Sequence, residues 1–259
     1  MAKIRINRQK DYKEQLKLYL NLSKSLNAKT KKLLRKTARK AEQEYLKFND
    51  MYYFFLEDFS DEFYKILSNH YKSVITTTSK RLIKQRETKQ EEDEDIDIIV
   101  ATYIAGVTAN KVAEISQTTR NQIKQAIKKG VADGLSIPQI AKLIQKNKSF
   151  APYRATMIAR TETHSAMNYA NHEISGKLGF NKPVKSWGSA LDDRTRPWHR
   201  SMNGKIVGRD EMFKVMTPIA GGGFIERRMI YTGDRNGGAL NVINCRCFTL
   251  YYDSEDEVI

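Results

Sequence analysis

One short loop carries most of the candidate catalytic residues of this chain. Residues 189–207, SALDDRTRPWHRSMNGKIV, include Asp192, Asp193 and His199. An acid beside a histidine can act as a general acid–base pair, so a metal-dependent hydrolase or nuclease is one interpretation of the loop. The chain has neither a nucleophile elbow nor a glycine-rich phosphate loop between a strand and a helix. We therefore expect the loop to be structural and the protein not to be an enzyme.

A structural loop of this composition needs polar partners. The segment 159–172, ARTETHSAMNYANH, is predicted to be helical, and Arg160, His164, Asn168 and His172 are each four residues apart on one face. Buried polar groups persist only when they are paired. We therefore predict an ionic lock between this helix and the loop, in which Arg160 and Glu162 pair with Asp192, Asp193 or Arg196. The full predicted polar network is Arg160, Glu162, His164, Asp192, Asp193, Arg196 and His199.

The only two cysteines lie in the sequence NCRC. Cys245, Cys247 and His199 could supply three zinc ligands, with His164 or an aspartate as the fourth. A single C-x-C is a weaker signature than paired C-x-x-C knuckles, and buried free cysteines at the end of a strand are the simpler interpretation. We therefore expect no cofactor and keep zinc as the alternative.

The first half of the chain is predicted to be helical. The first glycine is Gly106 and the first proline is Pro138, so no helix breaker interrupts the first hundred residues. Apolar residues with heptad spacing indicate a helical hairpin or bundle, with a break at Ser60–Asp61, a plausible N-cap. The stripe comprises Leu34, Ala38, Ala41, Tyr45, Phe48, Tyr52, Phe55 and Phe59.

Two further helices are predicted before residue 150. Six acids within residues 90–97 suit the first turn of a helix that ends at Gly130 or Gly134. Ser136 is a good N-cap for a short helix with Pro138 in its first turn. Helix, glycine turn and short helix also fit a DNA-binding helix-turn-helix, an alternative that remains open.

The predicted secondary structure changes near residue 150. A helix is expected from Pro152, then strands in PVKSWGSA, GKIV and CRCFTLYY, with GGGFIERR and YTGDRNGG as turns or mobile loops. The predicted fold is α+β: a basic helical region over residues 1–150, a compact α+β domain over 151–252 and a frayed acidic tail over 253–259.

Charge indicates the kind of partner. The chain has 45 Lys and Arg against 30 Asp and Glu, a net charge of +15. Residues 24–40 hold eight basic residues and no acid, which favours non-specific binding of double-stranded DNA, although docking on an acidic protein surface is the competing interpretation. The predicted DNA-contacting residues are Lys31, Lys32, Arg35, Lys36, Arg39 and Lys40. With no run of about 18 apolar residues, no membrane-spanning segment is expected.

Three stretches, taken in order, resemble the phage Mu protein F-like family of minor head proteins. They are ARTETHSAMNYA, WGSALDDRTRPWHRSMNGKIV and GDRNGGALNVINCRC, within residues 155–250. The sequence departs from the family where Thr232 stands in the place of a proline that many relatives have. Relatives are sometimes fused to toxin enzymes, for which we expect no room after NCRC.

The resemblance implies a particular place in the virus. Such a protein is a minor capsid protein of a tailed bacteriophage, made in the host cytoplasm and placed in the capsid interior near the portal. Its implied partners are the portal protein, a capsid or scaffold protein and the packaged DNA, and its implied role is in head assembly, packaging or ejection. An effector ejected into the host with the genome is the alternative.

Overall fold

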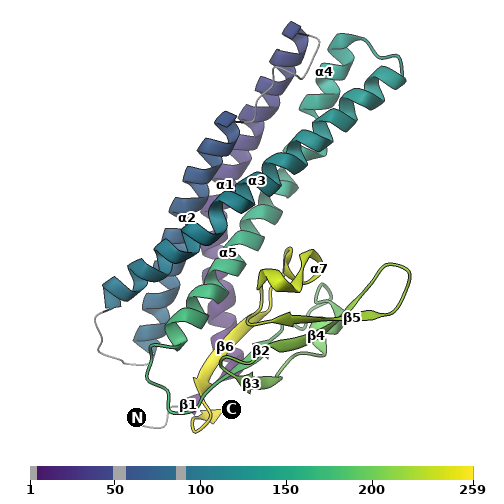
Figure 1. Cartoon of the computed structure of the whole chain (residues 1–259). Helices are drawn as coiled ribbons and strands as arrows, with labels where there is room; N and C mark the ends of the chain where they lie inside the picture. The colour runs from purple at the N-terminus through teal and green to yellow at the C-terminus, as the bar shows by residue number, and fades with distance from the viewer. Residues whose placement is uncertain (1–4, 49–56, 86–91, 259) are drawn as a thin grey trace. The chain divides into compact units, whose positions relative to one another are not determined.

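The computed structural model describes residues 5–48, 57–85 and 92–258. Helices dominate the first two thirds of the chain, and short antiparallel strands dominate the last third (Figure 1), which confirms the predicted α+β class. The main helices are α1 (Arg8–Phe48), α2 (Glu57–Gln85), α3 (Glu92–Ala132), α4 (Ile137–Gln145) and α5 (Pro152–Ser175).

The heptad stripe forms the buried face of α1. Its described members on this helix up to residue 45 are at most 5% exposed, whereas Phe48 at the helix end is 40% exposed. Tyr52 and Phe55 lie outside the described residues. The predicted break at Ser60–Asp61 is wrong, because both residues lie inside α2, where the Ser60 hydroxyl is 2.9 Å from that of Ser116. The described part of α1 ends at Phe48, and α2 begins at Glu57, three residues before Ser60.

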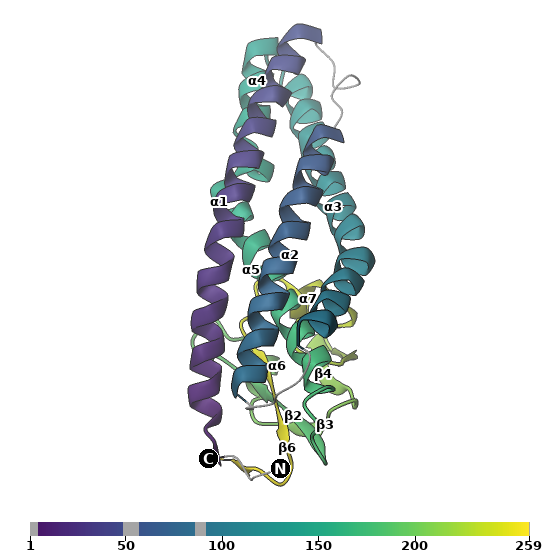
Figure 2. The same cartoon turned by 90° about the vertical axis from the view of Figure 1, so that its left-hand side faces the viewer.

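Helix α2 runs back along α1, as a hairpin requires. Lys36 lies 2.6 Å from Glu62 and Lys40 lies 2.5 Å from Asp58. The partner number falls as the α1 number rises, so the two helices are antiparallel, as Figure 2 shows. The predicted helical hairpin is therefore present over these residues.

The predicted starts and stops of α3 and α4 are confirmed. The described acids Glu92, Asp93, Glu94 and Asp95 lie at the start of α3, and Gly134 ends the turn after this helix with φ +67°, a conformation that glycine adopts without strain. Ser136 caps α4, and its backbone N–H donates to the Gln139 side chain at 2.8 Å. The α3–turn–α4 geometry is present, and a DNA-binding role for it stays a prediction.

Three small sheets complete the fold. In the central sheet, β2 (Pro183–Gly188) lies between β3 (Ile206–Gly208) and β6 (Phe248–Asp253), antiparallel to both. The three predicted strand segments are therefore confirmed. A separate hairpin pairs β4 (Phe213–Pro218) with β5 (Phe224–Met229).

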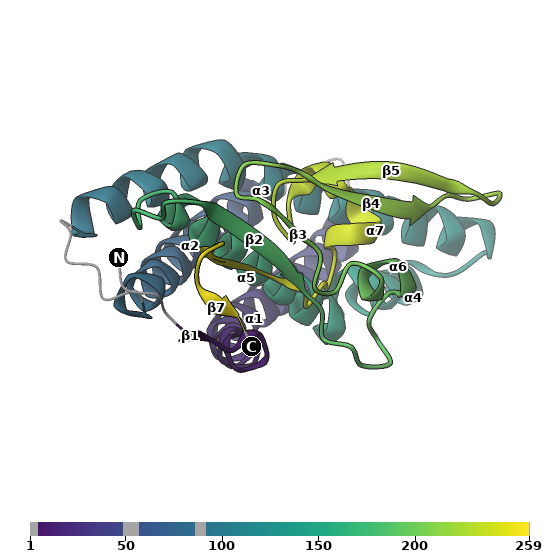
Figure 3. The same cartoon turned by 90° about the horizontal axis from the view of Figure 1, so that it is seen from below.

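Two predicted irregular segments turn out to be paired strands. Only the glycines of GGGFIERR form a turn, all with φ between +87° and +98°, and the rest is β5. Most of β5 is exposed, so it lacks the alternating apolar pattern that marks a strand. The acidic tail is not frayed either, because β7 (Glu257–Val258) pairs in parallel with β1 (Arg5–Ile6) (Figure 3).

The chain divides into two compact units. The sheet unit comprises Met1–Leu22, Tyr71–Ala101 and Arg160–Ile259, and the helical unit comprises Ser23–His70 and Thr102–Ala159. This division by contacts within the chain differs from the division at residue 150 expected from sequence, which stays a prediction. The core of the sheet unit is formed by Trp187, Met202, Phe213, Val215, Met229, Val242, Cys245 and Cys247.

The helical unit buries the guanidinium of Arg154 among neutral hydrogen-bond acceptors. Arg154 is 6% exposed, and its guanidinium donates to the Thr119 hydroxyl and the Ser149 carbonyl at 2.8 Å and to the Ile115 carbonyl at 3.1 Å. Burial lowers the pKa of Arg154. Because every contact is to a neutral acceptor, this arginine joins α3 to the segment before α5 without an acidic partner.

Helix α3 has a higher mean hydropathy than we expected from the absence of a long apolar run. Between Asp93 and Ala132 it contains an 18-residue window with a mean hydropathy of 1.3, of which 33% is buried. By length and composition alone this helix could cross a membrane, a test that core helices also pass. The expectation that no segment spans a membrane therefore stays a prediction.

Candidate functional site

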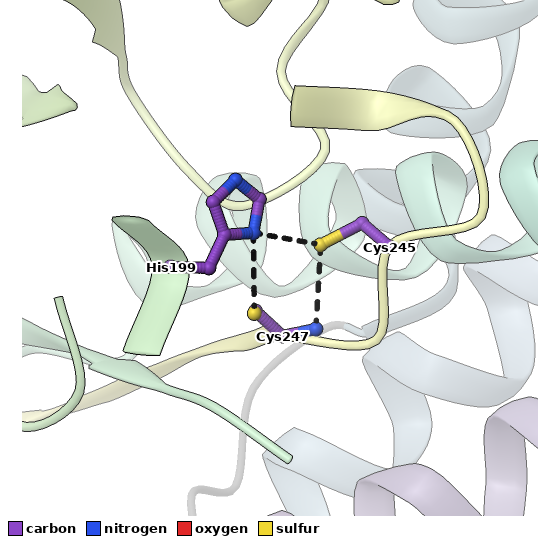
Figure 4. Close-up of side chains that lie close together, drawn as sticks. All are labelled: His199, Cys245 and Cys247. Atoms are coloured by element: carbon purple, nitrogen blue, oxygen red, sulfur yellow. Dashed lines mark hydrogen bonds between the residues drawn. The ribbon is translucent and has the colours of Figure 1, made fainter. Parts of the chain in front are cut away.

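His199, Cys245 and Cys247 lie together in the core of the sheet unit. Their ligand atoms all lie within 4.8 Å of one another, and the three residues are 1%, 2% and 3% exposed. The Nδ1 atom of His199 is 3.5 Å from the Sγ of Cys245 and 3.6 Å from that of Cys247 (Figure 4). His199 and the two cysteines, which follow it by 46 and 48 residues in the chain, thus face one point.

Asn241 selects the tautomer of the neutral His199 ring. Its Nδ2 donates to the Gly237 carbonyl, so Oδ1 faces the other way, where the Trp198 indole N–H donates to it at 2.8 Å. Oδ1 also lies 2.9 Å from the His199 Nε2. Since Oδ1 only accepts, Nε2 carries the hydrogen and the Nδ1 lone pair points at the two sulfurs.

Local sequence explains how each residue is presented. Pro197 begins the short helix α6 (Pro197–Arg200), and the Ser189 hydroxyl donates to the His199 carbonyl at 2.7 Å. Asn244, before the first cysteine, has φ +55°, which asparagine tolerates better than most residues, and its N–H donates to the Thr161 hydroxyl. The asparagine of NCRC is therefore a turn residue.

Arg246, the residue between the two cysteines, is held by its side chain and by its backbone carbonyl. The Arg246 guanidinium forms a two-pronged ion pair with Asp192, with Nη2 2.6 Å from Oδ1, and its carbonyl accepts from the Tyr12 hydroxyl at 2.9 Å. The hydrogen bonds from Arg246 hold the pKa of Asp192 well below its usual range. This pair fixes the backbone that carries both sulfurs.

The ionic lock predicted from sequence has other partners. Asp192 pairs with Arg246, Glu162 accepts from the Tyr71 hydroxyl at 2.6 Å, and the Arg196 guanidinium donates to the Ile243 carbonyl at 2.6 Å. Asp193 is exposed. Asp192 rather than Asp193 therefore fixes the loop.

Arg160 is half-buried and acts electrostatically on a neighbouring tyrosine. Burial raises the pKa of Tyr19, and the charge of Arg160 partly offsets that rise. Among the described ion pairs, none joins Arg160 to the loop, where Asp192 is paired with Arg246.

The polar face of α5 is joined to the strands. His164 Nε2 bonds to the Cys247 carbonyl, and because a carbonyl only accepts, this nitrogen carries the hydrogen. Burial lowers the pKa of His164, which favours the neutral ring. Asn168 accepts from the Thr232 hydroxyl at 2.7 Å and from the Thr249 N–H at 2.9 Å. Thr232, which stands where relatives have proline, is thus part of a hydrogen-bonded cluster.

The structure does not assemble the acid–base pair that the loop suggested. The two nitrogens of His199 face Asn241 and the sulfurs, Asp192 is bonded to Arg246, and Asp193 is exposed. Sequence reasoning missed Asn241 and Arg246, because neither belongs to a catalytic motif. The only available signal was their position beside or within the conspicuous segment that ends in NCRC.

Each of the two cysteines shifts the pKa of the other. Their mutual contact, in which the Cys247 N–H also donates to the Cys245 sulfur at 3.5 Å, lowers the pKa of Cys245 and raises the pKa of Cys247. Cys245 is therefore the more readily ionised of the two.

We expect a large contrast between the two adjacent aspartates. Asp192→Asn should lower the free energy of unfolding by about 1–2 kcal/mol, a value discounted because the Asp192 side chain is 40% exposed. Asp193→Asn should change it by less than about 0.5 kcal/mol. Urea denaturation of both variants measures the difference.

Low pH should remove the contribution of Asp192 to the free energy of unfolding. Its pKa is depressed in the folded state, so the stabilisation is complete above the unfolded value of about 3.9 and is lost as pH falls through the folded value. The gap between wild type and Asp192→Asn should therefore narrow below about pH 4. Equal losses in both aspartate variants would show that the loop is held in another way.

The basic residues of α1 lie in the helical unit. Lys32, Arg35, Lys36 and Arg39 are exposed at helical spacing, and Lys31 and Lys40 are half-buried. Lys36 and Lys40 carry the ion pairs to α2 given above. Among the described ion pairs, none involves the other four cations, so Lys31, Lys32, Arg35 and Arg39 are the part of this face best placed to meet a polyanion.

Comparison with known proteins defines the class of this fold and site. The family model described as Phage Mu protein F like protein matches residues 121–250, half of the chain, and includes α5, the loop and the NCRC cluster. The chain belongs to this family, which confirms the resemblance seen in the sequence.

Two curated relatives are similar to this chain. Minor head protein GP7 of Bacillus phage SPP1 is 34% identical over 136 residues, which cover 51% of this chain and 40% of the relative. The NAD(+)--arginine ADP-ribosyltransferase EFV of Enterococcus faecalis is 29% identical over 161 residues, which cover 60% of this chain and 31% of the relative. The chain thus spans less than half of either relative. No solved structure matches.

Proposed function

We propose that this protein is a minor head protein of a tailed bacteriophage with a role in head morphogenesis. Two findings support this: membership of the Mu F-like family and the similarity to the minor head protein of phage SPP1. The site itself also fits a structural role, because His199 and Asp192 are bonded to neighbouring groups of the same unit. The protein is accordingly a component of the virion, assembled with capsid or scaffold protein.

We further propose that it lies in the capsid interior, near the portal, and associates with double-stranded DNA. The observation that carries this is the exposed basic face of α1 in a chain of net charge +15. Packaged DNA is a dense polyanion, and clustered cations that lack acidic partners bind phosphate with release of counterions. Portal contact and a role in packaging or ejection belong to the same proposal. Its direct test is the location of the protein in purified particles.

An enzymatic role is the second candidate, because one relative is an ADP-ribosyltransferase. The similarity covers 31% of that relative, and the described residues do not join Asp192 or Asp193 to His199 as an acid–base pair. We infer that the shared segment is a head-protein module and that its task is structural. A structural head protein can also be released into the host with the genome, and such an ejected effector is the alternative to a protein that stays in the head.

A further inference from the structure

We propose that His199, Cys245 and Cys247 bind a zinc ion in the core of the sheet unit. The sequence alone favoured free buried cysteines and no cofactor. The geometry changes that expectation, because it brings an imidazole nitrogen and two sulfurs, all buried, to one point. Two thiolates and an imidazole are soft and intermediate ligands, which select zinc over magnesium, calcium or manganese.

Two of the three distances between the ligand atoms match a zinc site, and the two sulfurs lie within 4.8 Å of each other, where a tetrahedral ion would hold them about 3.8 Å apart. With zinc–sulfur bonds of about 2.3 Å, a zinc–nitrogen bond of about 2.05 Å and tetrahedral angles, sulfur and nitrogen ligands lie about 3.6 Å apart. The two observed separations from His199 Nδ1 are 3.5 and 3.6 Å. Both sulfurs therefore lie where a tetrahedral ion would hold them relative to the same nitrogen.

The His199 nitrogen can satisfy only one protonated thiol. The Nδ1 atom of His199 has one lone pair and can accept one strong S–H hydrogen bond, yet both sulfurs converge on it. The Ser189 hydroxyl, 3.6 Å from the Cys247 sulfur, offers a second acceptor for one thiol. A metal ion satisfies the lone pair and both sulfurs together, and its binding releases two thiol protons to solvent.

The hydrogen bond on the far side of the His199 ring is the one that a metal-bound imidazole needs. Asn241 accepts from His199 Nε2, which is the usual way to fix the tautomer of a histidine ligand.

The protein supplies three ligands. The fourth ligand expected from sequence was His164 or an aspartate, but among the described residues neither joins the group of His199, Cys245 and Cys247, and Asp192 is paired with Arg246. A three-residue set leaves the remaining position to water. The ion would tie α6 to the segment before β6 and so close the part of the chain that contains the β4–β5 hairpin.

Zinc content of the untagged full-length protein tests the proposal. Protein made in zinc-containing medium and purified without chelator should contain about one zinc per chain by elemental analysis. Replacement with cobalt should give a thiolate-to-cobalt charge-transfer band. Zinc below about 0.2 per chain, or a Cys245–Cys247 disulfide in the mass spectrum, would overturn the proposal whatever the variants do.

Variants locate the ion. Cys245→Ser, Cys247→Ser and His199→Gln should each reduce zinc to below about 0.2 per chain, whereas His172→Gln, which changes a half-buried histidine bonded to Tyr251, should retain it. Zinc that stays at the wild-type level in both cysteine variants lies elsewhere and contradicts the assignment. If a variant does not fold, the cobalt spectrum of the wild type still decides whether thiolates bind the metal.

Discussion

Asn241→Leu should lower the free energy of unfolding of the sheet unit by about 3–5 kcal/mol. Asn241 is fully buried, and its amide makes hydrogen bonds to Trp198, His199, Thr217 and Gly237. Leucine fills a similar volume but leaves two donors and the Gly237 carbonyl without a partner, and it removes one hydrogen bond to the Thr217 hydroxyl. Each orphaned buried group costs about 1–3 kcal/mol, less where water can reach it.

Tryptophan fluorescence during urea denaturation is the appropriate measurement. The chain has two tryptophans, and both Trp187 and Trp198 pack edge-on against His199, so the signal reports this site. Asn236→Leu is the matched control, since Asn236 is exposed five residues away and should cost less than about 0.5 kcal/mol. Similar midpoints for the two variants would mean that Asn241 does not organise the site.

Neutralising the four cations of α1 that take part in no described ion pair should abolish most DNA binding. If Lys31, Lys32, Arg35 and Arg39 each contact phosphate, the logarithm of the wild-type affinity should fall against the logarithm of salt concentration with a slope of about −3.6. Changing all four to glutamine should flatten the slope by about three to four and weaken duplex binding at low salt by about 100-fold or more. Fluorescence anisotropy with duplexes of unrelated sequence measures both quantities.

The helical unit offers a control with the same change of charge. Arg120, Lys124, Lys128 and Lys129 are exposed on α3, and their replacement by glutamine also removes four positive charges. This variant should keep most of the affinity if the α1 face is the binding surface. Equal losses would assign binding to net charge alone. Unchanged DNA affinity in the α1 variant, together with failure to enter heads, would make this face a protein-docking surface.

Local signals in the sequence were sufficient for most elements. The heptad stripe, the acidic first turn of α3 and the Ser136 cap each act within a few residues, and each matches the structure. The strand β5 was missed because its pairing with β4 is supported by backbone hydrogen bonds and not by an apolar alternation. Side-chain periodicity cannot report such a strand.

The hydrogen-bond and ion-pair partners of the polar side chains were harder to predict from sequence than the helices and strands. The sequence identified Asp192 as a residue needing a partner, but Arg246, 54 residues later, supplies it rather than Arg160. Likewise, the C-x-C pair was recognised as a possible ligand set, whereas the role of Asn241 depends on three segments meeting. Long-range pairing is decided by the tertiary fold, which residue spacing does not encode.

Protease protection in purified particles tests the central claim most directly. DNA-filled particles of the phage that encodes this chain would be treated with protease and nuclease before and after opening, and the protein quantified by mass spectrometry against the major capsid protein. A minor protein of the head interior should be present in few copies, resist protease in intact particles and become sensitive once they are opened. Its absence from particles, or complete digestion while the heads remain closed, would contradict the proposal.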